Sequence, residues 1–466
     1  MRNTTRREFL RTAGLALAGA PAVLGGESAP GAAGRDRKLN FVFILIDDMG
    51  WADLSCYGST YHLSPIIDRL AGQGMRFTDA YAACPVCSPT RASILTGKYP
   101  ARVGVTDFIP GHWRPWAKLV VPKIHNQLPL QETTIPEALK PAGYVSACFG
   151  KWHLGGGKLF GPDKQGFDVT GGGRGADRDK QVKSLTDKAL EFIEGNRDKP
   201  FFLYLSHHSV HIRLEAPREL VDKHKARLKP GQKPPAQCNP TYAAMIEHLD
   251  NNVGRVLGKL DELKLADRTA VIFFSDNGGL IKIYTGGPPV VTSNAPLRSE
   301  KGSLYEGGIR VPLIVRLPGV VSPGSVCREP VTSVDFLPTI LELAGVRKKP
   351  DPAIDGVSLL PLLAGTGPLK REAIYWHYPH YHHTAPCGAV RAGRHKLIEY
   401  FEDGRCELYD LAEDIGERND LAAKMPDKAA ELRRKLASWR KTVGALMPTQ
   451  NPDHDPEKAH LWGRRQ

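Results

Sequence analysis

The chain has 466 residues, of which 41% are hydrophobic and 24% are charged, and its formal net charge is +13. This length and composition allow a large buried core, which excludes a disordered chain and a small disulfide-stabilised scaffold. The positive charge favours anionic ligands, but the sequence has no long basic run and no zinc-finger spacing, so we expect no nucleic-acid partner. The eight cysteines are spread along the chain, and the sequence leaves their pairing open.

The first 34 residues are expected to be an export signal and a linker. Arg6 and Arg7 precede an apolar stretch from Leu15 to Leu24 and then small residues, a pattern typical of a twin-arginine signal. The apolar stretch is shorter than the ~20 residues that span a bilayer, and no later stretch is longer, so we expect no integral membrane span. The predicted location is periplasmic or extracellular.

Apolar strands alternate with helices from residue 38 to about residue 360. Strands are expected at Lys38–Ile46, Pro200–Ser206 and Thr269–Ser275, and helices begin at Ser64 and Thr134 and span Tyr242–Leu263. This alternation predicts an α/β fold in which helices flank a large, mostly parallel sheet.

The pattern changes after residue 360. Residues 394–401 and 405–411 are expected to form short paired strands, and Asp427–Val443 is expected to form a closing amphipathic helix. We therefore predict a catalytic domain over residues 38–360 and a smaller C-terminal α+β domain over residues 361–450.

Reactive side chains follow three of the predicted strands. Asp47 and Asp48 come after the first strand, and Asp276 and Asn277 come after the third. The second strand is followed by His207, His208 and His211. Because ligands bind beyond the carboxyl ends of the strands in open α/β sheets, we expect these groups to form one site.

The carboxylates and the amide at these strand ends offer hard oxygen ligands. Such ligands suit one divalent cation, Ca²⁺ in preference to Mg²⁺, rather than zinc or copper. A two-zinc phosphatase site would need histidine among its ligands, and Asn277 stands where one would lie. This disfavours a phosphatase.

The stretch from Cys87 reads Cys-Ser-Pro-Thr-Arg and continues through Leu95-Thr96-Gly97. It resembles the signature of the formylglycine-dependent sulfatases, in which the cysteine of Cys-x-Pro-x-Arg is oxidised to formylglycine by a maturation enzyme. Cys84 has Val86 rather than proline two places later, so Cys87 is the matching cysteine. The alternative, a redox or metal pair of Cys84 and Cys87, lacks a second pair.

Other segments resemble the same family over most of residues 40–420. They are "FILIDDMGWADLSCYG" with Asp47 and Asp48, "GKWHLG" with Lys151 and His153, "SHHSVH" with His211, "SDNGG" with Asp276 and Asn277, and "EKGSLYEGGIRVP" with Lys301. The resemblance implies an alkaline phosphatase-like fold. It also implies metal ligation by Asp47, Asp48, Cys87, Asp276 and Asn277, and catalysis by Cys87, Arg91, Lys151, His153, His211 and Lys301.

The implied chemistry fits these residue types. The cation, Arg91, Lys151 and Lys301 would neutralise the sulfate ester and the charge that develops in the transition state. One hydroxyl of the hydrated aldehyde would attack sulfur and the other would later expel sulfate. By resemblance, His211 is the acid that protonates the departing alcohol, and His153 assists hydrate deprotonation or sulfate elimination.

The substrate is expected to be a sulfated glycan rather than a small aryl sulfate. Two stretches, residues 111–118 and 375–396, mix aromatic and basic residues and are expected in loops near the site. They would either bind a sugar and its anionic groups or pack the two domains together. Two other functions stay open: a phosphonate or phosphate ester hydrolase of the same superfamily, and a glycan-binding protein without turnover if Cys87 is unmodified.

Overall fold

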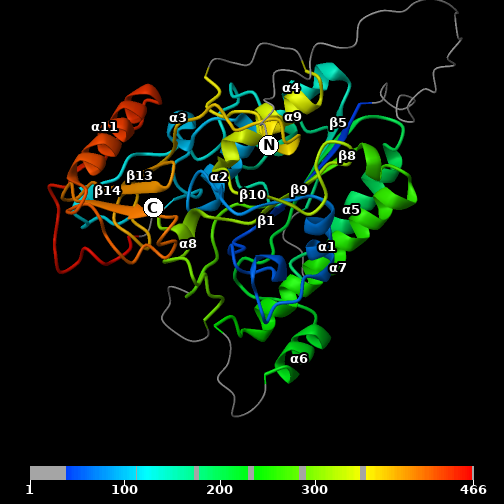
Figure 1. Ribbon diagram of the computed structural model, residues 1–466, viewed down its shortest axis with the longest axis horizontal. Coiled ribbons are helices and arrows are strands. Elements are labelled where there is room, and N and C mark those ends of the chain that lie inside the picture. The colour runs from blue at the N-terminus through cyan, green and yellow to red at the C-terminus, as the bar shows by residue number, and fades with distance from the viewer. Residues whose placement is uncertain are drawn as a thin grey trace, which may run out of the picture. The chain divides into compact units, whose positions relative to one another are not determined.

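The computed structural model describes residues 38–111, 113–172, 178–228, 236–282, 290–346 and 353–463 (Figure 1). The predicted export signal and linker, residues 1–34, lie outside the described residues. Residues 38–466 form one compact unit by their contacts. The domain boundary expected near residue 360 stays a prediction. None of the described helices is long and apolar enough to cross a membrane.

The main element of the described chain is an eight-stranded sheet. Its strands in spatial order are β10 (Ser325–Cys327), β2 (Met75–Phe77), β9 (Leu313–Arg316), β8 (Thr269–Ser275), β1 (Asn40–Ile46), β7 (Phe201–Ser206), β5 (Val145–Gly150) and β6 (Val169–Gly171). Only β9 runs antiparallel to its neighbours β2 and β8. The prediction of a large, mostly parallel sheet is therefore confirmed.

Alternate side chains of the central strand β1 enter two different cores. Val42, Ile44 and Ile46 pack with α1 (Pro65–Gln73), α5 (Val182–Gly195) and α7 (Pro240–Glu262). Phe41, Phe43 and Leu45 pack with α2 (Cys87–Thr96), α4 (Ile135–Leu139) and α9 (Phe336–Leu343). Helices thus cover both faces, and Figure 1 shows α5 and α7 side by side on one of them. Such double cover explains why the strand is apolar at every position.

The remaining helices are shorter or lie away from the sheet. They are α3 (Pro100–Val103), α6 (Arg218–Ala226), which packs on α7, α8 (Glu306–Ile309) and α10 (Leu360–Leu363). Two small two-stranded sheets pair β3 (Ala80–Tyr81) with β11 (Val331–Thr332) and β4 (Leu119–Val120) with β16 (Thr449–Gln450).

The helix predicted to begin at Ser64 is α1, and Ser64 does hold the N-cap position. Its hydroxyl makes no capping bond, however, and donates to Asp68 at 3.1 Å. The first-turn N–H groups of Ile66 and Ile67 donate to the carboxylate of Asp250 on α7 instead. A residue 184 positions away therefore caps this helix, which a local capping pattern does not predict.

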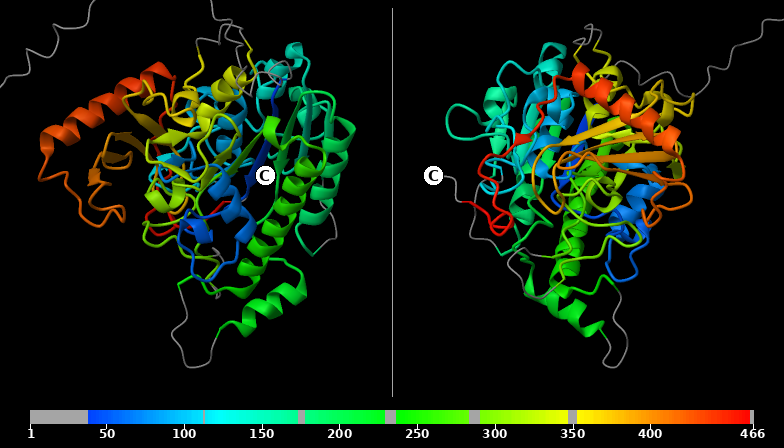
Figure 2. Two further views of the ribbon diagram at one scale, coloured as in Figure 1. Left: turned by 45° about the vertical axis from the view of Figure 1, so that its right-hand side comes forward. Right: turned by 90° about the vertical axis from the view of Figure 1, so that its left-hand side faces the viewer.

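A second, antiparallel sheet contains β12 (Ile374–Tyr378), β13 (Cys387–Ala392), β14 (His395–Tyr400) and β15 (Cys406–Asp410). The two strands expected at residues 394–401 and 405–411 are β14 and β15, and the expected closing helix is α11 (Pro426–Thr442). Leu432 and Leu436 of α11 pack on one face of this sheet. Figure 2 shows the helix lying along the strands of the sheet. The other face packs against Tyr81 and Tyr305 of the catalytic part.

The expectation that residues 375–396 form a loop is wrong for most of that stretch. β12 and β13 occupy both of its ends, and residues 379–386 connect them. Trp376 and Tyr378 are buried on the face of the antiparallel sheet that packs against Tyr81, so these aromatic residues pack as alternating strand residues do.

Candidate active site

The register of the large sheet brings the predicted strand-end residues together. Ile46 of β1 pairs with Ser275 of β8, and Leu45 pairs with Ser206 of β7. Because all three strands run parallel, their next residues emerge at one edge of the sheet. Asp47 and Asp48 therefore lie beside Asp276, and the N–H of Asp48 donates to Oδ1 of Asp276 at 3.2 Å.

Helix α2 brings the cysteine to the same edge. Cys87 is its first residue, after the extended N-cap Val86, and every residue of the helix is buried. Single ligand atoms of Cys87, Asp47 and Asp276 lie within 4.8 Å of one another. Burial raises the pKa of the Cys87 thiol, although Lys151 and Lys301 lie close enough to oppose the shift.

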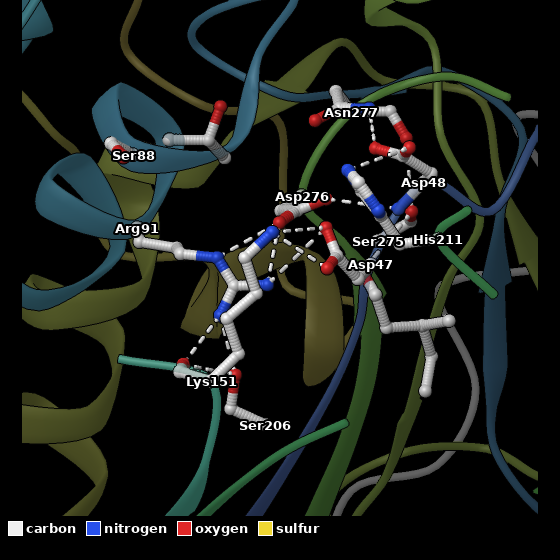
Figure 3. Close-up of polar contacts among 12 residues, drawn as sticks. Asp47, Asp48, Ser88, Arg91, Lys151, Ser206, His211, Ser275, Asp276 and Asn277 are labelled. Carbon is white, nitrogen blue, oxygen red and sulfur yellow. Dashed lines mark hydrogen bonds and ion pairs between the residues drawn. The ribbon is translucent and has the colours of Figure 1, made fainter. Parts of the chain in front are cut away.

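Arg91 lies one helical turn after Cys87, on the same side of α2. Its Nε and Nη2 donate to Oδ2 of Asp276 at 2.9 and 2.6 Å, and Nη1 donates to the carbonyl of Lys151 at 2.7 Å (Figure 3). Nη1 also donates to the hydroxyl of Ser206 at the end of β7. The fully buried guanidinium thus links α2 to the ends of three strands.

Two lysines neutralise the carboxylates that follow β1. Lys151 donates to both oxygens of Asp47 at 2.9 and 2.6 Å, and Lys301 donates to Oδ2 of Asp48 at 2.8 Å. Burial alone would raise the pKa of both aspartates, but these lysines, with His211, hold the two pKa values below the usual range. Asp276 differs, since burial raises its pKa to about 6 despite the contact with Arg91.

The strand-end groups fit a divalent cation with oxygen ligands. Asp47, Asp48 and His211 form a second group whose ligand atoms lie within 4.8 Å of one another. Asn277 donates from Nδ2 to Asp48 at 2.8 Å, while its buried Oδ1 has no hydrogen-bond partner among the described residues. A buried carbonyl oxygen without a donor, beside ionised carboxylates, is an arrangement that a hard cation satisfies.

The two histidines have different free nitrogens. Nε2 of His153 hydrogen-bonds to the carbonyl of Ile109 at 2.8 Å, which assigns the proton to Nε2 and leaves the buried Nδ1 as an acceptor. Burial, together with Lys151 and Arg91, lowers the pKa of His153 to about 3. Nδ1 of His211 donates to the carbonyl of Ile212, and its Nε2 lies 3.6 Å from Asp48.

These groups open into a cavity of about 430 Å³. The predicted site residues on its wall are Asp47, Cys87, Lys151, His153, His211 and Lys301. The other lining residues are Phe108, Ile109, Lys180, His208, Ile212, Leu280 and His382; only His208 and His382 lie in segments that the sequence placed near the site. His208 follows a strand end and was noted there, but a lysine in a charged loop, such as Lys180, carries no sequence signal of its own.

His382 reaches the cavity from the connection between β12 and β13. It packs against Gly302, whose φ of +80° and contact with the His382 ring exclude a larger residue, because an added Cβ would lie 1.8 Å from Nδ1. His383 hydrogen-bonds to the carbonyl of Lys301. The C-terminal sheet thus contributes to the wall beside Lys301.

The stretch at residues 111–118 does not line this cavity in the described residues. It packs instead against the C-terminal segment 449–463, where Asn451 donates to the carbonyls of Pro115 and Ala117 at 2.8 and 2.7 Å. The guanidinium of Arg114 lies 3.8 Å from the ring centre of Trp462. The stretch is thus a packing element for the end of the chain.

An alkaline phosphatase-like sheet that presents carboxylates and cations at one edge defines a hydrolase of anionic esters. The Sulfatase family model matches residues 39–346, and a model described as N-sulphoglucosamine sulphohydrolase, C-terminal, matches residues 299–442. The chain belongs to the sulfatase family, and it is a sulfuric ester hydrolase.

Relatives match over most of the chain. A protein named Sulfatase from Formosa agariphila is 33% identical over 505 aligned residues, covering 87% of this chain and 89% of the relative. N-acetylgalactosamine-6-sulfatase from Canis lupus familiaris is 33% identical over 74% of this chain and 70% of its own length. The crystal structure of Ps i-CgsB in complex with k-i-k-neocarrahexaose has a TM-score of 0.74 at 26% identity, covering 91% of this chain and 96% of that chain.

Proposed function

We propose that this enzyme hydrolyses a sulfate ester on a glycan to an alcohol and inorganic sulfate, with a formylglycine made from Cys87 as the nucleophile. The observation that carries the proposal is the position of Cys87, which lines the cavity at the start of α2 together with Lys151 and Lys301. Burial raises the pKa of its thiol, so an unmodified Cys87 stays protonated and is a weak nucleophile. The modification would supply a hydrated aldehyde in its place.

Lys151 and Lys301 bind and orient the sulfate group in this proposal. Each ammonium is hydrogen-bonded to an aspartate, so its position is set before the substrate arrives. Arg91 lies deeper, where it fixes Asp276 and neutralises charge next to Cys87. Preorganised cations of this kind stabilise the charge that develops as the ester bond breaks.

Asp47, Asp48, Asp276 and Asn277 are the residues that would hold the cation. The hard oxygen donors and the neutralised aspartates favour Ca²⁺, with Mg²⁺ as the alternative. The cation would supply Lewis acidity that polarises the sulfate oxygens and lowers the pKa of the attacking group.

The two histidines move protons at different atoms. Nδ1 of His211 already donates to Ile212, so His211 would act as the acid in its doubly protonated form, in which Nε2, 3.6 Å from Asp48, carries the proton that passes to the departing alcohol. His153 holds its proton on Nε2 against Ile109, so Nδ1 accepts a proton from the nucleophile. These hydrogen bonds support a transfer at Nε2 of His211 and at Nδ1 of His153.

A glycan substrate is supported by the cavity and by the relatives. Phe108 and Leu280 offer apolar contact for a sugar ring, and Lys180 adds a cation that has no ion-pair partner among the described residues. Ps i-CgsB was solved with neocarrahexaose, and a second relative is named for a sulfated amino sugar. The positively charged chain would also attract polyanionic chains.

We further propose that the enzyme is exported by the twin-arginine route to the periplasm or the outside of the cell. The support is the pattern at Arg6 and Arg7. Twin-arginine export carries folded cargo, so the maturation enzyme would have to modify Cys87 before folding.

Peptide mass spectrometry across residues 80–98, on protein from a maturation-competent host, tests the proposal directly. We expect Cys87 as formylglycine and Cys84 unchanged. Cys87→Ala should abolish hydrolysis of 4-nitrophenyl sulfate, whereas the matched variant Cys84→Ala should retain it. An unmodified Cys87 in a protein that still hydrolyses sulfate esters would refute the assigned nucleophile, and faster turnover of a phosphonate monoester would refute the substrate class.

A further inference from the structure

A second cavity, also of about 430 Å³, lies between the 111–118 stretch and the C-terminal segment. It is lined by Arg114, Ala117, Lys118, Glu402, His454, Pro456, Ala459 and His460. Half of these residues, Arg114, Lys118, His454 and His460, carry basic or titratable nitrogen groups. The lone carboxylate in the lining, Glu402, already accepts a hydrogen bond from Tyr381 at 2.6 Å.

Arg114 is the central residue of this cavity. Its guanidinium lies 3.8 Å from the ring centre of Trp462 and 5.7 Å from that of Tyr381. Its Nε is buried without a hydrogen-bond partner, and no carboxylate of the described residues lies within ion-pair distance. Burial lowers the pKa of Arg114, although Tyr381 and Glu402 oppose the shift.

Arg114 is half-buried, its guanidinium is stacked on two rings, and no described carboxylate lies within ion-pair distance, so an anionic ligand could pair with it directly. Stacking on two rings holds the group in one orientation and leaves its in-plane donors for an oxyanion. At the edge of the same region, Trp113 and Trp462 are 43% and 39% exposed. Exposed aromatic rings beside a fixed cation suit an anionic sugar better than a free inorganic ion.

The two cavities have no lining residue in common, but residues of both lie close together in the sequence. Tyr381, which stacks on Arg114, directly precedes His382, which lines the active-site cavity. Phe108 and Ile109 of the active-site cavity lead along the chain to Arg114. Two short chain segments therefore run from the active-site cavity to the residues around Arg114.

We propose that the Arg114 cavity is a second anion-binding subsite, which holds a sulfate or carboxylate group of another sugar unit on the glycan that occupies the active site. The assignment of the ligand to the substrate chain rests on the proposed function, whereas the anion site itself does not. The subsite would make longer, multiply charged chains bind more tightly than a single sulfated unit.

Binding without turnover tests this inference. Full-length protein with Cys87→Ala is titrated with dextran sulfate of about 5 kDa by calorimetry, with and without Arg114→Gln. The control is Arg76→Gln, which also removes one charge and one arginine stacked on a tyrosine, 5.2 Å from the ring centre of Tyr57. We expect Arg114→Gln to weaken binding at least about 5-fold and Arg76→Gln less than about 2-fold.

Two further measurements keep the result decisive. Thermal melting shows whether Arg114→Gln releases the C-terminal segment. If it does, Lys118→Gln replaces it as the variant that tests the subsite. The Lys118 side chain lines the cavity and makes no described hydrogen bond. Sodium sulfate at the same sulfate concentration should not displace the polymer. The subsite is refuted if the deciding variant binds within twofold of Arg76→Gln, and its assignment to a glycan is refuted if sodium sulfate competes equally.

Because these titrations use protein that cannot turn over, they are independent of the proposed reaction. A loss of binding in Arg114→Gln, combined with a matured enzyme that hydrolyses no sulfate ester, would keep the subsite and refute the proposed function. A matured enzyme that hydrolyses sulfate esters, combined with unchanged binding in Arg114→Gln, would keep the proposed function and refute the subsite.

Discussion

Lys301 donates a hydrogen bond from Nζ to Oδ2 of Asp48 at 2.8 Å, so a residue proposed to bind sulfate contacts a residue proposed to bind the cation. The two proposed sites therefore share one carboxylate. Removing the ammonium of Lys301 should therefore weaken sulfate binding but not cation binding, whereas removing the charge of Asp48 should weaken cation binding.

Removing the ammonium tests this coupling. Lys301→Met frees Oδ2 of Asp48, so we expect Ca²⁺ to bind at least as tightly as in the parent protein, while kcat/KM falls at least about 100-fold because a sulfate ligand is lost. Calorimetric Ca²⁺ titration and a sulfatase assay measure the two effects. Asp48→Asn is the matched comparison and should weaken Ca²⁺ binding. Loss of Ca²⁺ binding in Lys301→Met would contradict the shared-carboxylate arrangement.

The assigned proton roles predict different responses to the leaving group. An acid is needed for a poor leaving group such as a sugar hydroxyl and much less for 4-nitrophenol. His211→Asn should therefore lower kcat about 10³-fold on a sugar sulfate but only about 10-fold on 4-nitrophenyl sulfate. His153→Asn should lower both rates to a similar extent, because its Nδ1 serves the nucleophile. Equal sensitivity of the two substrates to His211→Asn would remove it from the acid role.

Lys180 should favour substrates that carry a second anionic group. It lines the active-site cavity without a described ion-pair partner. Lys180→Met should raise KM about 10-fold for a disulfated sugar and less than about 2-fold for a monosulfated one, with kcat unchanged. The control is Lys183→Met, three residues along, which pairs with Asp187 at 2.8 Å outside the cavity. An equal effect on both sugars would mean that Lys180 does not select a second anion.

His207 predicts a pH dependence of stability. It is fully buried with neither ring nitrogen bonded to a described residue, and burial lowers its pKa to about 3. The unfolded chain, with an ordinary histidine pKa near 6.5, binds the proton first as pH falls, so stability present above pH 6.5 is lost on acidification. At pH 5 the loss is about 2 kcal/mol.

Denaturant unfolding at pH 7 and pH 5 measures this loss. His207→Phe should lose about 2 kcal/mol less between the two pH values than the parent protein, whatever its absolute stability at pH 7. An identical drop in both proteins would show that His207 is already protonated, or solvated, in the folded state.

Much of the candidate site could be predicted because the residues that mark it lie close together in the sequence. The offset from Cys87 to Arg91 is one helical turn, and the carboxylates follow apolar strands directly. The antiparallel strands at β14 and β15 were likewise evident from short runs of alternating residues. Residues 375–396 were expected in a loop because they mix aromatic and basic residues, whereas β12 and β13 occupy both ends of the stretch. Of the two roles expected for it, packing between the two parts of the chain fits Trp376 and Tyr378.

The remaining contacts depend on residues far apart in the chain. Nothing near Ser64 predicts that Asp250 caps its helix, and nothing near Arg114 predicts that Trp462 stacks on it. Lys180 and His382 reach one cavity from separate connections. Such contacts arise from how packed layers place loop residues, which no window of sequence records.

The amino-acid sequence alone was enough to predict several buried strands, the cysteine motif, and the carboxylates and the amide that follow the strand ends. Only the tertiary structure decided which charges neutralise one another, which histidine nitrogen is available, and which walls enclose the two cavities. The physical reason is the separation along the chain over which each kind of interaction acts. Propensity and periodicity act over a few residues, whereas hydrogen bonds such as Arg91 to Asp276, 185 positions apart, exist only after the sheet and its helices have packed.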